Sequence, residues 1–65
     1  MTNLDAAIEY LDRAMAALDA ARHEIDPNDP DLIYTRGKIA TTQTMTDANR
    51  SMLVITRNKR ESVQP

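Results

Sequence analysis

Few side chains in this 65-residue sequence are of a type that could do chemistry. It contains no cysteine, which excludes a disulfide framework and a thiolate metal site, and its single histidine, His23, argues against zinc. His23 and Glu24 match no catalytic motif, so we interpret them as part of a solvated helix face. Gly37 is the only glycine, which leaves no glycine-rich phosphate loop. The sequence therefore predicts no catalytic residue, no cofactor and no metal site.

Charged residues recur at regular intervals but do not form a ligand set. Four aspartates lie seven residues apart, which places successive carboxylates about 10 Å apart along a helix, too far to share one cation. They are Asp5, Asp12, Asp19 and Asp26. Basic residues gather near the other end of the chain, as Arg50, Arg57, Lys59 and Arg60. They could contact phosphates, but a pI near 5.1 argues against a nucleic-acid-binding domain.

The two halves of the sequence carry opposite charge. Residues 1–31 hold eight acidic and two basic residues, a net charge of −6, whereas residues 32–65 hold six basic and two acidic residues, a net charge of +4. One interpretation is an antiparallel hairpin whose two arms attract each other. The other is head-to-tail packing of identical chains, in which the acidic arm of one meets the basic arm of the next.

The first arm has the heptad pattern of a helix over about residues 3–25. Apolar residues at a 4-3-4-3 spacing form one stripe, the predicted helix-packing seam. Its members are Leu4, Ile8, Leu11, Met15, Leu18 and Ile25. Arg22 falls at a core position, so the seam loosens there or Arg22 reaches a carboxylate. Ala7, Ala14 and Ala21 flank the stripe and allow a second helix to come close. An intramolecular core and a self-associating coiled coil both remain open.

A turn separates the two arms. Pro27, Asn28, Asp29 and Pro30 cannot lie inside one continuous helix, because two prolines interrupt it. Asp29 is a suitable N-cap and Pro30 suits a first helical position, so a second helix is predicted to begin near residue 30. A short connection of this kind makes two helices antiparallel.

The second arm is predicted to be a helix over about residues 30–58. Leu32, Ile33, Ile39 and Ala40 would face one way, whereas Met45, Ala48, Met52 and Ile55 form a second stripe roughly opposite. One hairpin partner covers only one side, so the second stripe is a predicted contact between subunits. The density of threonine leaves a rival interpretation open, a β-hairpin of residues 39–46 and 51–57. Residues 59–65 are predicted to be a polar tail that frays.

The turn and its surroundings resemble a known family. Residues 27–33 read Pro-Asn-Asp-Pro-Asp-Leu-Ile, Lys38 follows, and Asn49 and Ser51 come about twenty residues after the turn. This arrangement is similar to the needle-forming and inner-rod subunits of bacterial type III secretion systems, over about residues 15–57. The sequence departs from that family at Gln43 and Asp47, where the family has aromatic residues, and in its basic polar tail.

These observations predict one all-α domain spanning residues 1–65, an antiparallel two-helix hairpin completed by self-association. The expected function is that of a non-enzymatic structural subunit, whose partners are copies of itself and other assembly proteins. A secretion needle or rod is the assembly that the resemblance implies. The alternatives are a small helical adaptor, chaperone or virion-associated protein that binds through its Leu/Ala face, and, least favoured, a dimeric nucleic-acid binder.

The sequence also bears on location. No apolar run approaches the length of a membrane span, and the N-terminus lacks the features of a cleaved signal. We therefore expect synthesis in the cytoplasm, with export to an appendage, or incorporation into a virion, left open.

Overall fold

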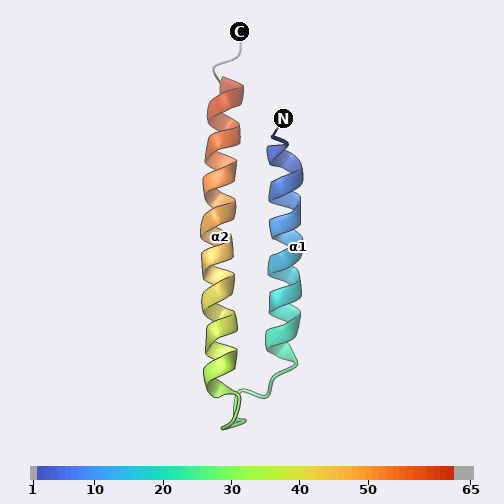
Figure 1. The fold of residues 1–65 in the computed structure, drawn as a ribbon, viewed down its shortest axis with the longest axis vertical. Helices are drawn as coiled ribbons and strands as arrows, with labels where there is room; N and C mark the ends of the chain where they lie inside the picture. The colour runs from blue at the N-terminus through green and yellow to red at the C-terminus, as the bar shows by residue number, and fades with distance from the viewer. Residues whose placement is uncertain (1, 63–65) are drawn as a thin grey trace.

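The computed structural model describes residues 2–62, which form two antiparallel helices joined by a turn (Figure 1). Helix α1 comprises Leu4–His23 and helix α2 comprises Ile33–Ser62. The two helices lie side by side over the length of α1, and their free ends lie at the same end of the hairpin. The described residues contain no strand. The predicted all-α hairpin is confirmed.

Helix α1 begins and ends with local hydrogen bonds that its sequence supplies. The side chain of Asn3 caps the helix by accepting a hydrogen bond from the Ala6 amide at 3.0 Å. Asp5 in the first turn and Arg22 in the last have the charges that the helix dipole favours. The amide of Glu24 closes the helix by donating to the Ala20 and Ala21 carbonyls. The predicted bounds, about 3–25, are thus two residues too long at the C-terminal end.

The connection consists of two consecutive Asp-Pro turns with the same hydrogen bonds. The side chain of Asp26 accepts from the Asn28 amide at 2.8 Å, and that of Asp29 accepts from the Asp31 amide at 2.9 Å. The backbone carbonyls of the two aspartates accept from the amides of Asp29 and Leu32, each at 3.1 Å. An aspartate side chain that bonds the backbone two residues on is the usual way in which Asp favours a turn.

This pattern corrects the predicted start of the second helix. Asp29 caps a single turn over residues 29–32, with Pro30 inside that turn, and α2 begins at Ile33 rather than near residue 30. The first α-helical hydrogen bond of α2 runs from the Arg36 amide to the Leu32 carbonyl at 2.8 Å. Leu32 and Ile33, expected on one face with Ile39 and Ala40, precede or open the helix and are 38% and 55% exposed.

Helix α2 is continuous through its threonine-rich part, so the β-hairpin interpretation is wrong. Four threonine hydroxyls donate to the carbonyl four residues earlier, so each hydroxyl has a hydrogen-bond partner within the helix. They belong to Thr41, Thr42, Thr44 and Thr46. The helix ends at Ser62, four residues beyond the predicted residue 58. The predicted fraying tail is therefore helical over residues 59–62, and residues 63–65 lie outside the described part.

The core between the helices is thin. Ile8, at 5% exposure, is the one apolar side chain that is buried among the described residues. The other members of the predicted seam, Leu4, Leu11, Met15, Leu18 and Ile25, are half-buried. Half-buried residues of α2, among them Ile39, Ala40, Leu53 and Val54, face them. The accessible surface is 5153 Å², whereas a compact protein of this mass exposes about 4,200 Å².

Candidate functional site

A ladder of polar pairs connects the two helices. Arg57 Nη1 donates to Asp5 Oδ1 at 3.0 Å, Arg50 Nε donates to Asp12 Oδ1, and Gln43 Nε2 donates to Asp19 Oδ1 at 3.4 Å. Each step of seven residues forward on α1 matches a step of seven residues back on α2. We call these three pairs the charge ladder. They show that three of the four aspartates spaced by seven pair with the other arm of the same chain.

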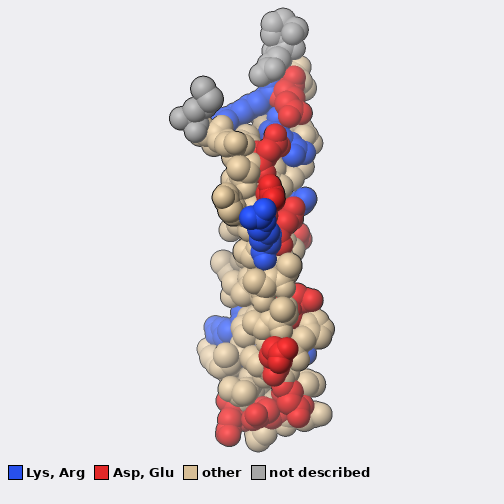
Figure 2. All heavy atoms as spheres, turned by 90° about the vertical axis from the view of Figure 1, so that its right-hand side faces the viewer, with Lys and Arg blue, Asp and Glu red and all other residues tan. Residues whose placement is uncertain are grey.

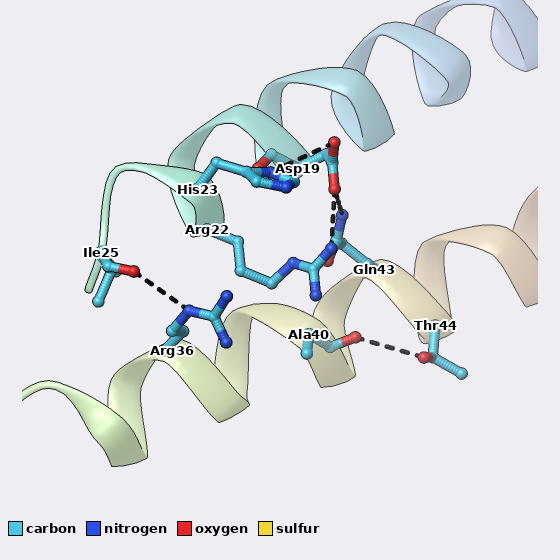
Figure 3. A network of polar contacts seen from close by, with 8 residues as sticks. All are labelled: Asp19, Arg22, His23, Ile25, Arg36, Ala40, Gln43 and Thr44. Atoms are coloured by element: carbon cyan, nitrogen blue, oxygen red, sulfur yellow. Dashed lines mark hydrogen bonds and ion pairs between the residues drawn. The ribbon is translucent and has the colours of Figure 1, made fainter. Parts of the chain in front are cut away.

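The partners on α2 were not anticipated as a set, although the sequence contains the signal. Arg36, Gln43, Arg50 and Arg57 also lie seven residues apart. The fourth step would pair Arg36 with Asp26, but α1 has already ended at His23. Arg36 Nε instead donates to the backbone carbonyl of Ile25 at 3.2 Å (Figure 3). This bond ties the start of α2 to the end of α1.

Asp19 is the centre of a polar cluster near the turn (Figure 3). Arg22 Nη2 donates to Asp19 Oδ1 at 2.9 Å, and His23 Nδ1 lies 3.5 Å from Asp19 Oδ2. The hydrogen bonds from Arg22 and then Gln43 lower the pKa of the Asp19 carboxyl below its usual value. Arg22, the arginine at a core position of the seam, thus reaches a carboxylate, which is one of the two outcomes predicted for it. Its Nε is buried and has no hydrogen-bond partner within the described residues.

Large apolar side chains are exposed on the side of α2 that points away from α1. Met45, Met52 and Ile55 are 63%, 65% and 66% exposed, and Ala48 between them is exposed as well. Tyr34 continues the same side toward the turn, because it is 11 residues before Met45, close to three helical turns. We call these five residues the outer face of α2. It contains the four residues predicted to contact another subunit, and the structure places them where such a contact is sterically open.

One exposed side of α1, beside its contact with α2, is lined by small residues. Its exposed members are Tyr10, Ala14, Ala17, Ala20 and Ala21, which we call the outer face of α1. Arg13 crosses this face, paired with Glu9 at 2.6 Å and lying 5.6 Å above the Tyr10 ring. Figure 2 looks onto the α1 side and shows an uncharged band across the middle of the molecule, with acidic residues gathered at the turn end. The outer face of α2 thus contains no charged residue, whereas Arg13 and Glu9 lie across that of α1.

The described residues offer little else that resembles a site. No group of three or more His, Cys, Asp or Glu residues is close enough to hold a metal ion in that part of the chain. An open hollow at the free end is lined by Thr2, Asn3, Leu4, Asp5 and Arg60. Within residues 2–62, neither helix has the length and apolarity that crossing a bilayer requires.

Comparisons with protein-family models, curated proteins and solved structures found no match to this chain. The resemblance to type III secretion needle and inner-rod subunits therefore stays a prediction from the residues that carry it.

Proposed function

We propose that this chain is a non-enzymatic structural subunit that assembles with copies of itself through the outer face of α2. The observation that carries the proposal is the distribution of apolar side chains. Three large ones, Met45, Met52 and Ile55, are each about two-thirds exposed on one side of α2, whereas Ile8 is the only apolar side chain that is buried among the described residues.

The energetic argument follows from this distribution. Full burial of a Met or Ile side chain contributes about 1.5–3 kcal/mol relative to leaving it exposed. A small two-helix hairpin gains little from its own core, because ordering the chain costs a comparable free energy. Covering the outer face of α2 supplies apolar burial that the hairpin alone lacks. Folding and assembly would then stabilise each other.

A secretion needle or rod is the finer form of this proposal. The hairpin with its Pro-x-x-Pro turn supports it, together with the resemblance at residues 27–33, Lys38, Asn49 and Ser51. Another filament, a virion component or a finite oligomer would use the same outer face.

Sedimentation velocity over a range of concentrations tests the proposal. The wild-type chain is expected to form species larger than a monomer as concentration rises. Met52→Asp should remain a monomer, because association would bury an unpaired charge in an apolar contact. Asn58→Asp makes the same change in charge at an exposed position of α2 outside the outer face, and should associate like the wild type.

The adaptor or chaperone alternative gives a different result in the same experiment. A wild-type chain that stays a folded monomer at high concentration would contradict the self-assembly proposal. The outer faces would then be available to a different protein, as an adaptor requires.

A further inference from the structure

We infer that the outer face of α2 packs on the outer face of α1 of a neighbouring copy, with all copies pointing the same way. This inference rests on the proposed function and specifies its interface. On α2 the outer face lies opposite the contact with α1, whereas on α1 the outer face lies to one side of that contact. Moving a copy sideways and turning it about the long axis of the hairpin therefore brings the two outer faces together. The helices at the new contact are antiparallel, as they are inside the hairpin.

The register of the charge ladder can be carried over to this new contact. Asp12 lies opposite Arg50 in one chain. Five residues further along α1 is Ala17, and five residues back along α2 is Met45. In the same register Tyr10 lies opposite Met52. The large side chains of α2 thus face the small or flat side chains of α1, and methionine makes favourable contacts with aromatic rings.

The positions of the charged residues favour this arrangement over one in which the outer faces of α2 of two chains contact each other. In the same register, Lys38 of one copy lies opposite Glu24 of the next, because Glu24 comes twelve residues after Asp12 and Lys38 comes twelve residues before Arg50. An antiparallel α2–α2 contact that places Met45 against Met52 would instead place Lys38 against Lys59. A parallel α2–α2 contact would place each lysine against the same lysine of the other chain. Like charges in direct opposition are unfavourable.

The resulting contact is heterologous, because each copy uses one face to bind and the other to be bound. Such contacts continue from copy to copy and give a row, a ring or a tube rather than a closed dimer. Every interior copy would then have both outer faces covered.

Cysteine cross-linking tests the arrangement, because the chain has no cysteine of its own. Ala17→Cys and Met45→Cys chains are treated separately and as a mixture with a short bismaleimide. We expect cross-linked pairs in the mixture and almost none in either chain alone, and a ladder of multimers from the doubly substituted chain. Efficient cross-linking of Met45→Cys to itself would overturn the inference in favour of an α2–α2 contact.

A charge reversal gives an independent readout that does not depend on cysteine geometry. Lys38→Glu should raise the dissociation constant about two- to tenfold in sedimentation, and adding Glu24→Lys in the same chain should restore it. An α2–α2 contact predicts the opposite, since Lys38→Glu would remove a lysine–lysine repulsion. The failures of the two proposals also differ. A monomeric wild type contradicts self-assembly itself, whereas oligomers without Ala17–Met45 cross-links contradict only this arrangement.

Discussion

The side-chain amide of Gln43 on α2 donates a hydrogen bond to the carboxylate of Asp19 on α1 across 3.4 Å. At the next two levels toward the free ends, an arginine takes the place of the glutamine and pairs with the aspartate. Asp19 needs no second arginine, because Arg22 of its own helix already neutralises it. The ladder thus sets the register of the hairpin with two ion pairs and one hydrogen bond from a neutral amide to a carboxylate.

The ladder predicts a measurable dependence of stability on the Asp12–Arg50 pair. Arg50→Glu places two like charges together and should lower the free energy of unfolding by about 1 kcal/mol, since exposed pairs are individually weak. Exchanging the charges, with Asp12→Arg added, should recover most of the loss. Thermal unfolding followed by circular dichroism at low and high salt measures both effects. Equal stability of Arg50→Glu and the wild type at low salt would contradict the pair.

The thin core predicts an uneven response to truncation along the seam. Ile8→Ala should cost about 2–5 kcal/mol, because Ile8 is buried. A chain of this length has a total stability of roughly 3–10 kcal/mol, so much of the helicity should be lost. Leu18→Ala should cost less, since Leu18 is half-buried. Tyr10→Ala, at an exposed position, should stay within about 0.5 kcal/mol of the wild type at concentrations where the chain is monomeric.

The two Asp-Pro turns predict that Asp26 and Asp29 contribute equally to the stability of the hairpin. Asp26→Ala and Asp29→Ala should each destabilise the hairpin by about 1 kcal/mol, because each removes a side-chain acceptor for a backbone amide. Asn28→Ala is the control, since Asn28 contributes its backbone amide to this pattern. Urea unfolding of the three variants gives the comparison. Greater sensitivity at Asn28 than at either aspartate would show that the turn is built differently.

The lowered pKa of Asp19 predicts a loss of stability in acid. The folded state holds this proton less tightly than the unfolded chain, so the stabilisation is present above about pH 4 and declines as the pH falls through the lowered pKa. Asp19→Asn should flatten the part of the pH profile below about pH 4. Asp47→Asn, at an exposed position, should leave it unchanged. Melting temperatures measured at closely spaced pH values between about 2 and 6 decide between these outcomes.

The fold was predictable because its signals are local and periodic. Leu4 to Ile25 repeat with a helical period, and a helix cannot continue through both Pro27 and Pro30. The start of α2 was misplaced because Asp29 and Pro30 suit a turn as well as a helix N-terminus. The rival β-hairpin could not be excluded from propensity alone, because hydroxyl bonds such as that of Thr41 form only where the helix is already present.

The candidate interface could be predicted in part, because its residues also recur with a helical period. The spacing of Met45, Ala48, Met52 and Ile55 along the sequence was enough to place them on one side of a helix. The pairing of Asp12 with Arg50 required the register of the two helices, which the sequence suggests only when the heptad of aspartates is compared with that of Arg36, Gln43, Arg50 and Arg57. The acidic and basic arms attract within one chain, so their opposite charge does not by itself require a neighbouring copy.

Methyl NMR of methionine tests the central claim, self-assembly through the outer face of α2, most directly. The chain has four methionines, and three of them, Met15, Met45 and Met52, lie in described and contrasting positions. Met15 lies in the seam between the helices, whereas Met45 and Met52 are exposed on the outer face of α2. With the methyl groups carbon-13 labelled and assigned by substitution, we expect the Met45 and Met52 signals to shift or broaden as the protein concentration rises, while the Met15 signal changes little. Signals of Met45 and Met52 that do not depend on concentration, up to the highest attainable, would contradict the account.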